Sequence, residues 1–188
     1  MKEIRWHGRG GNGAFTAAKL LGAAASVHEG KYAQSFPAFG PERRGAPVAG
    51  FTRISDEVIT DHSQVYSCDC VIVLDETLMD VVNVTAGMKE DAVFIMNTQR
   101  SAEDVKQDKR LKGVKNVFTI DATSIALEKL GVPIVNTVML GATVGAAKFV
   151  GINALEDAID EMMAGSRGEK NKEAARIAYD EIMKGAVS

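Results

Sequence analysis

The sequence predicts an α/β protein: one Rossmann-like domain over residues 1–188, with a mostly parallel sheet and helices on both faces. Three observations favour this fold class. Short apolar runs alternate with helical segments, a glycine-rich turn joins the first strand to the first helix, and 188 residues fit one ordinary domain. The composition, with 46% hydrophobic and 25% charged residues, is typical of a folded soluble protein.

The first half of the chain supplies most of the predicted strands. They are residues 3–7, 31–36, 48–54 and 70–74. The first has an apolar face made by Ile4 and Trp6, and the last is apolar on both faces, which is typical of a strand buried in a parallel sheet. Residues 14–28 are rich in Ala and Leu and predict a helix, and Asp75 opens another.

The second half continues the alternation. Strands are predicted at 92–96 and 117–120, and helices at 122–130, 136–149 and 169–184. Asn153 and Glu156 have the spacing of a capping box that opens one more helix, which Ser166-Arg167-Gly168 would end. Gly141 and Gly145 belong to a stripe of small residues that lets another backbone come close.

The two cysteines, Cys68 and Cys70, are two residues apart, so in a regular strand their side chains share one face. A zinc or iron–sulfur site usually needs four such ligands, and the sequence therefore predicts no cluster in this chain. The formal net charge of −3 gives no general attraction to nucleic acid or anionic lipid. The sequence has neither a signal-peptide core nor a membrane-spanning apolar run, which predicts a cytoplasmic protein.

The glycine-rich turn is the first candidate site. Its glycines are Gly8, Gly10, Gly11 and Gly13. Gly8, Gly10 and Gly13 fit the G-x-G-x-x-G pattern at a place where backbone amides and a helix N-terminus can hold a phosphate. A nicotinamide-binding fold also needs an acid at the end of the second strand. Glu29 precedes that strand and no carboxylate ends it, so tight packing of a turn remains the alternative.

The second candidate site is the stretch 39–47, in which Glu42, Arg43 and Arg44 lie between prolines and glycines. Guanidinium groups suit two-point contacts with phosphate or carboxylate, and a stiff loop loses little entropy on binding. The alternative is a solvated loop whose arginines pair with the neighbouring glutamate.

No catalytic triad is predicted. The histidines are His7, His28 and His62, far apart in sequence, and no Ser or Cys has the setting of a nucleophile elbow. Helix capping accounts for the polar residues that follow strands or open helices, which are Asp75, Asp121 and Asn136.

Three stretches taken together resemble the gamma subunits of the pyruvate:ferredoxin oxidoreductases, in the wider 2-oxoacid:ferredoxin oxidoreductase family. They are residues 4–13, 39–47 and 136–142. The likeness spans nearly the whole chain, and the run Phe-Gly-Pro-Glu-Arg-Arg-Gly-Ala-Pro is more specific than the glycine turn and favours the pyruvate branch. A common family form has Gln where Asn12 stands, which keeps the amide.

The resemblance implies a part in a larger enzyme that oxidatively decarboxylates pyruvate with coenzyme A, giving acetyl-CoA, carbon dioxide and reduced ferredoxin. Thiamine diphosphate and the iron–sulfur clusters would belong to the partner alpha, beta and ferredoxin-like delta subunits, and none to this chain. Ferredoxin would be the electron acceptor of the complex. The isolated chain, without a catalytic residue of its own, is expected to be inactive.

The same resemblance implies a role in holding coenzyme A, because the equivalent domain of single-chain relatives lies over the active-site entrance. The hypothesis is that Arg43 and Arg44 contact the phosphates. The amides of Gly10, Gly11 and Gly13 would help.

Two alternatives stay open. The first is an independent NAD-binding Rossmann dehydrogenase, which relies on the glycine turn and leaves the arginine stretch unexplained. The second is a purely structural subunit, in which the arginine stretch contacts protein and the polar face of the first strand, with Arg5 and His7, helps to form the interface.

Overall fold

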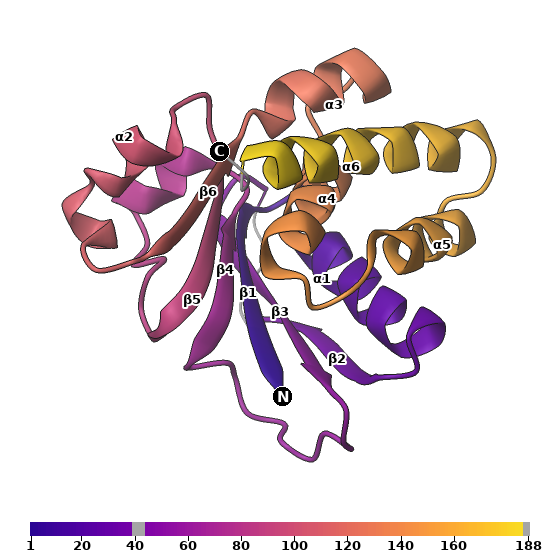
Figure 1. Cartoon of the computed structure of the whole chain (residues 1–188), viewed down its shortest axis with the longest axis horizontal. Helices are drawn as coiled ribbons and strands as arrows, with labels where there is room; N and C mark the ends of the chain where they lie inside the picture. The colour runs from indigo at the N-terminus through magenta and orange to yellow at the C-terminus, as the bar shows by residue number, and fades with distance from the viewer. Residues whose placement is uncertain (39–43, 186–188) are drawn as a thin grey trace.

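The computed structural model describes residues 1–38 and 44–185, and within them six strands form one sheet in the order β2-β3-β1-β4-β5-β6 (Figure 1). The strands are β1 (Lys2–Arg9), β2 (Tyr32–Pro37), β3 (Pro47–Ser55), β4 (Cys68–Val73), β5 (Met88–Asn97) and β6 (Asn116–Ile120). Each of them contains or overlaps a predicted strand, and the α/β class is confirmed.

Parallel pairing joins β1, β4, β5 and β6, whereas β3 is antiparallel to both β1 and β2. Three of the five pairings are parallel, so the prediction of a mostly parallel sheet is confirmed. Because β3 lies between β1 and β2, the first two strands of the chain are not neighbours.

The helices are α1 (Ala14–Ala23), the π-helix η1 (Ala24–His28), the 3₁₀-helices η2 (Glu76–Asp80) and η3 (Lys109–Leu111), α2 (Ala102–Lys106), α3 (Ala122–Leu130), α4 (Asn136–Ala147), α5 (Ile152–Met162) and α6 (Ser166–Gly185). Both faces of the sheet are covered, as predicted, but unequally. The long helices α1, α4, α5 and α6 gather on one face with α3, and α2, η2, η3 and loops cover the other (Figure 1).

A buried hydrogen-bond chain ties the sheet to α1. The indole of Trp6, which is fully buried, donates to Thr52 Oγ1 at 3.1 Å, and Thr52 Oγ1 donates to the Ala18 carbonyl at 3.0 Å. Since a buried polar group without a partner destabilises a fold, these bonds let β1 and β3 place polar atoms against the helix.

The prediction that Cys68 and Cys70 share a face is wrong. The pairing of β4 with β5 shifts register between the two cysteines, so a bulge interrupts the alternation of side chains. Cys70 packs on the helical face with Ile72, whereas Cys68 packs on the opposite face with Val71. Both thiols are buried and free, and burial raises the pKa of each.

The polar face of β1 is not an outer surface. Arg5 and His7 are only 8% and 6% exposed, because the segment after η2 lies over them. Arg5 Nη2 donates to the carbonyls of Val84, at 2.9 Å, and Ala86, at 2.5 Å. The expectation that this face forms an interface is therefore wrong.

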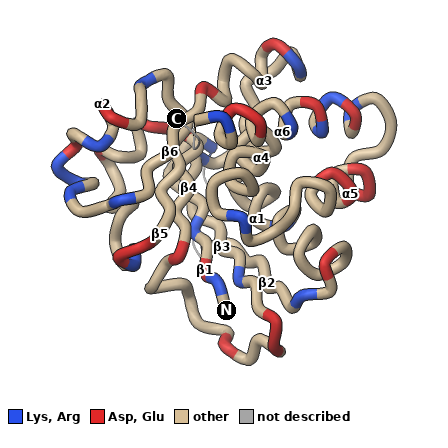
Figure 2. The backbone as a smooth tube through the Cα atoms, viewed as in Figure 1, with Lys and Arg blue, Asp and Glu red and all other residues tan. Residues whose placement is uncertain are grey.

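Several predicted helix boundaries need correction. Asp75 opens the 3₁₀-helix η2 instead of an α-helix, and α2 and η3 were not predicted. Asn153 is no cap, since α5 begins after Gly151 and Glu156 instead pairs with Arg176 of α6 at 2.6 Å. The predicted breaker at Ser166 is the first residue of α6, along which basic and acidic segments alternate (Figure 2).

Gly141 shows why the small-residue stripe of α4 matters. A Cβ built on Gly141 collides with the carbonyl group of Ala175 in α6, and one on Gly145 comes within 3.2 Å of Ile182 Cγ2. The stripe therefore lets α4 and α6 pack backbone to backbone, as predicted.

We expect Gly141→Ala to lower the free energy of unfolding by about 1–3 kcal/mol, because overpacking against backbone outweighs the better helix propensity of alanine. Gly185→Ala is the matched control, since no described atom lies within 4 Å of a Cβ there. Urea denaturation measures both variants. A Gly141→Ala chain as stable as the wild type would contradict the packing of α4 on α6.

Candidate functional site

The candidate site lies at the sheet edge where β1, β4, β5 and β6 end. From β1 the chain turns through α1 toward β2 and β3, whereas from β4 it turns toward β5 and β6. The crevice between β1 and β4 is therefore the point where strand order reverses, which is where ligands bind in open α/β sheets.

The glycines of the turn are needed for its shape. Gly11 and Gly13 have φ of 98° and 82°, in the left-handed region that favours glycine. A Cβ on Gly13 would lie 2.7 Å from Nδ2 of Asn136, and one on Gly8 would collide with the Asn12 side chain. Backbone conformation accounts for Gly11, and tight packing against Asn12 and Asn136 accounts for Gly8 and Gly13, without a ligand.

The two predicted sites come together in the structure. Gly10 forms a parallel bridge with Arg44, its N–H donates to the Ala46 carbonyl at 2.8 Å, and its carbonyl accepts from Gly45 N at 3.0 Å. The Gly10 amide is consequently used within the fold, which corrects its predicted role as a phosphate donor. Within residues 1–38 and 44–185, the N–H groups of Gly11 and Gly13 donate no hydrogen bond.

Arg44 is exposed, and its guanidinium has no hydrogen bond or ion pair to any residue that the structure describes. Arg43, with Glu42, lies outside the described residues. Of the predicted arginine site, the structure therefore describes only Arg44 and the residues that follow it.

Arg9, which sequence reasoning missed, connects the parts of the site. Its Nε donates to Asp75 Oδ2 at 2.7 Å, its Nη1 to the Gly45 carbonyl at 3.0 Å, and its Nη2 to Thr77 Oγ1 at 2.6 Å. One side chain thus joins the end of β1, the start of η2 and the residue after Arg44.

Asp75 is the fixed anchor of this connection. Its Oδ1 accepts from the N–H of Thr77 at 2.9 Å and from Thr77 Oγ1 at 2.6 Å, as an N-cap of η2. Partial burial by itself raises the pKa of Asp75, but the hydrogen bonds from Thr77 and Arg9 outweigh it and hold the pKa below its usual range. Asp75 is therefore ionised at neutral pH, and the predicted cap is confirmed.

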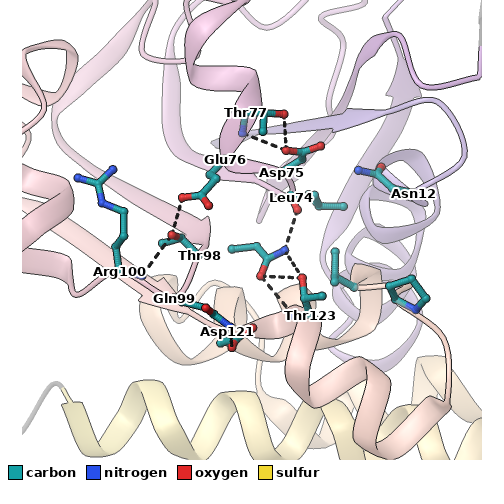
Figure 3. Close-up of a pocket in the computed structure, with 13 residues that line it drawn as sticks. Asn12, Leu74, Asp75, Glu76, Thr77, Thr98, Gln99, Arg100, Asp121 and Thr123 are labelled. Carbon is teal, nitrogen blue, oxygen red and sulfur yellow. Dashed lines mark hydrogen bonds between the residues drawn. The ribbon is translucent and has the colours of Figure 1, made fainter.

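A pocket of about 590 Å³ opens beside this anchor (Figure 3). Its lining comes from the ends of β4, β5 and β6 and the residues that follow them, from the first turns of η2 and α3, and from the loops before α1 and α4: Asn12, Leu74, Asp75, Glu76, Thr77, Asn97, Thr98, Gln99, Arg100, Asp121, Thr123, Pro133 and Val135. Asn97 Nδ2 fixes one wall by donating to the Leu74 carbonyl at 2.9 Å and to Thr123 Oγ1 at 3.0 Å.

The charge of the pocket is unfavourable to phosphate. Asp75, Glu76 and Asp121 contribute carboxylates, and Arg100 is the cation among the lining residues, opposite Asn12 (Figure 3). Asp121 caps α3 by accepting from Ser124 N at 3.0 Å, as predicted. Carboxylates, amides and hydroxyls suit neutral hydrogen-bonding groups or cations, so an anion fits the Arg44 side of the turn better than this pocket.

Histidine chemistry finds no support at this edge. Burial, reinforced by the neighbouring Arg5, lowers the pKa of His7 from its ordinary 6.5 to about 3, so His7 is neutral. It is not among the residues that line the pocket. Within residues 1–38 and 44–185, no three His, Cys, Asp or Glu side chains come together as metal ligands. No helix in that part of the chain is long and apolar enough to cross a membrane.

The sequence comparisons agree on one family. A family model described as pyruvate ferredoxin/flavodoxin oxidoreductase matches residues 3–181. The chain is 54% identical over 184 residues to pyruvate synthase subunit PorC of Methanothermobacter marburgensis, covering 97% of this chain and 98% of the relative. It is 52% identical over 180 residues to the pyruvate/ketoisovalerate oxidoreductases common subunit gamma of Pyrococcus furiosus, covering 96% of each.

Solved structures share the fold. The crystal structure of pyruvate oxidoreductase subunit PORC from Thermotoga maritima superposes with a TM-score of 0.81 at 38% identity, covering 95% of both chains. A 2-oxoglutarate:ferredoxin oxidoreductase of Magnetococcus marinus, with coenzyme A bound, matches with a TM-score of 0.75 over 98% of this chain and 31% of that one. At 20% identity, the second likeness shows the fold alone.

The pKa of His7 predicts how stability depends on pH. Folding lowers this pKa, so the unfolded chain binds one more proton than the folded chain between about pH 3 and pH 6.5. Stability therefore falls as the pH drops through this window, with a slope of up to about 1.4 kcal/mol per pH unit for one proton. Urea denaturation of His7→Gln between pH 7 and pH 4.5 should show a shallower dependence, whereas an unchanged slope would contradict a neutral buried His7.

Proposed function

The chain belongs to the pyruvate ferredoxin/flavodoxin oxidoreductase family, and from this we propose that it is the gamma subunit of a pyruvate:ferredoxin oxidoreductase. The resemblance seen in the sequence is thereby confirmed. In the proposed complex, pyruvate and coenzyme A yield acetyl-CoA and carbon dioxide, and the electrons pass to ferredoxin. Thiamine diphosphate and iron–sulfur clusters supply the carbon and electron chemistry from the alpha, beta and delta subunits.

Within that complex, we propose that this chain positions coenzyme A without a catalytic residue of its own. The observation that carries the proposal is the bridge between Gly10 and Arg44, which brings the backbone of Arg44 beside the glycine turn at the strand-order reversal, with a guanidinium that is unpaired within residues 1–38 and 44–185. Both features suit a diphosphate: the guanidinium by two-point hydrogen bonding, and the turn by the amides of Gly11 and Gly13, which donate no hydrogen bond within the described part of the chain.

The phosphate contacts are divided among few groups. Of the two arginines, Arg44 is among the residues that the structure describes. Arg43 belongs to the proposal because it stands beside Arg44 in the sequence. The N–H groups of Gly11 and Gly13 supplement them at the N-terminus of α1, where the helix dipole favours an anion. Gly10 contributes through its backbone bonds, which fix the arginine stretch to the turn.

Binding of this kind aids the reaction without chemistry in this chain. Holding the thiol acceptor near the reacting carbon raises its effective concentration and lowers the entropy lost in the transition state. The carboxylates of Asp75, Glu76 and Asp121 reinforce the placement, because they repel phosphates from the neighbouring pocket.

A stand-alone NAD-binding dehydrogenase is disfavoured by the sheet. The strand parallel to β1 is β4, and the acid at its end, Asp75, occupies the position where a ribose would be held. Both of its oxygens are already bonded, to Arg9 and to Thr77. Glu29 is engaged as well, accepting from Lys31 Nζ and from Gly151 N.

The test is reconstitution of the whole complex with Arg44→Ala, alone and with Arg43→Ala. We expect the Michaelis constant for coenzyme A to rise severalfold to about tenfold, with kcat at saturating coenzyme A unchanged, because a charge-assisted contact contributes about 1.5–3 kcal/mol and exposure reduces it. Lys112→Ala, an exposed lysine after η3, is the control.

An unchanged Michaelis constant in the double variant would overturn the proposal. Weaker subunit assembly by size exclusion, with intact coenzyme A kinetics in the complex that remains, would instead support the purely structural role of the arginines.

A further inference from the structure

We propose that Arg9 is a positioning residue for coenzyme A, because its guanidinium holds the end of the arginine stretch against the glycine turn and so sets where Arg44 stands. This inference rests on the proposed function. Arg9 stands at a variable position between Gly8 and Gly10, so neither the glycine motif nor the arginine stretch assigns it a role.

Arg9 is not itself a phosphate ligand. All three of its guanidinium nitrogens donate to protein acceptors, and its charge is balanced by Asp75 at 2.7 Å. The two side chains are about equally shielded, 30% and 31% exposed, so the pair is half-buried. By contrast, Arg44 is exposed and unpaired within the described chain, and it is the group left to meet an anion.

The β4 side of the connection is rigid. The N–H of Leu74 donates to the His7 carbonyl at 2.9 Å, and its carbonyl accepts from Asn97 Nδ2 at 2.9 Å. The next residue, Asp75, is fixed by two hydrogen bonds from Thr77. Arg9 is thus bonded to a residue, Asp75, whose own position is fixed by the sheet and by Thr77.

The position of residues 44–46 depends on Arg9 more strongly than the position of Asp75 does. Residues 44–46 are held to the turn by two backbone hydrogen bonds with Gly10, and Arg9 Nη1 to the Gly45 carbonyl is the one side-chain hydrogen bond to them in the described chain. Gly45 has a φ of 79°, so the chain reverses sharply just after Arg44. A shift of Gly45 therefore moves Arg44 directly.

Arginine is required by the geometry of the three acceptors. They come from two separate segments, the start of η2 and the residue after Arg44, and only the planar fork of a guanidinium presents donors to all three acceptors at once. A lysine at this position keeps the attraction to Asp75 but loses the contact with Gly45 or with Thr77. Arg9→Lys is thus a conservative variant that separates charge from positioning.

The first experiment measures steady-state kinetics of the reconstituted complex with Arg9→Lys and Arg9→Gln. We expect the Michaelis constant for coenzyme A to rise about threefold to tenfold in both, with kcat at saturating coenzyme A and the Michaelis constant for pyruvate unchanged. Arg176→Gln, which breaks a comparable ion pair with Glu156, is the control and should leave all three parameters at their wild-type values.

A second arm separates positioning from a direct contact. In the background Arg43→Ala with Arg44→Ala, Arg9→Gln should cause no further rise in the Michaelis constant for coenzyme A, because Arg44, the group that it positions, is gone. A full additional rise would show that Arg9 binds coenzyme A itself, and would overturn the positioning role.

A third arm needs no activity. Amide hydrogen exchange of Gly10 and Gly45 in the full chain should accelerate in Arg9→Gln and stay at the wild-type rate in Arg176→Gln. If Arg44→Ala raises the Michaelis constant for coenzyme A but Arg9→Gln does not, the positioning role is wrong and the proposed function stands. If neither variant raises the Michaelis constant for coenzyme A, the proposed function fails. Unchanged amide exchange at Gly10 and Gly45 in Arg9→Gln would show in addition that Arg9 does not hold residues 44–46 against the turn.

Discussion

The arrangement of this site depends on one half-buried guanidinium. Arg9 leaves the end of β1 and satisfies an aspartate, a threonine hydroxyl and a backbone carbonyl that come from segments about 36 to 68 residues away in sequence. Because a partly buried cation is stable only when its charge and donors are matched, the ends of β1 and β4 and the residues after Arg44 are constrained together.

That constraint divides the sheet edge into two electrostatic environments. On the side of the arginine stretch, Arg44 and the amides of Gly11 and Gly13 offer donors to an anion. On the other side, the pocket contains carboxylates that are held ionised by their hydrogen bonds, as for Asp75 and Asp121. Under the proposed function, this division of charge orients coenzyme A with its phosphates toward Arg44 and away from the pocket.

The sequence predicted the strands, the longer helices and the glycine turn, because each depends on local periodicity, propensity or backbone freedom. It could not predict what depends on pairing between distant segments. The bulge that places Cys68 and Cys70 on opposite faces is set by the register against β5, and the burial of Arg5 by a loop some 80 residues later. The bond from Arg9 to Asp75 is of the same kind, although an arginine and an aspartate at the carboxyl ends of two parallel strands are a usable signal.

The most direct test is a structure of the assembled complex with coenzyme A bound. We expect phosphate oxygens within hydrogen-bond distance of the Arg44 guanidinium, with Arg9 still bonded to Asp75 and to the Gly45 carbonyl. Phosphates bound inside the carboxylate-lined pocket, or at a place remote from both the glycine turn and Arg44, would contradict it.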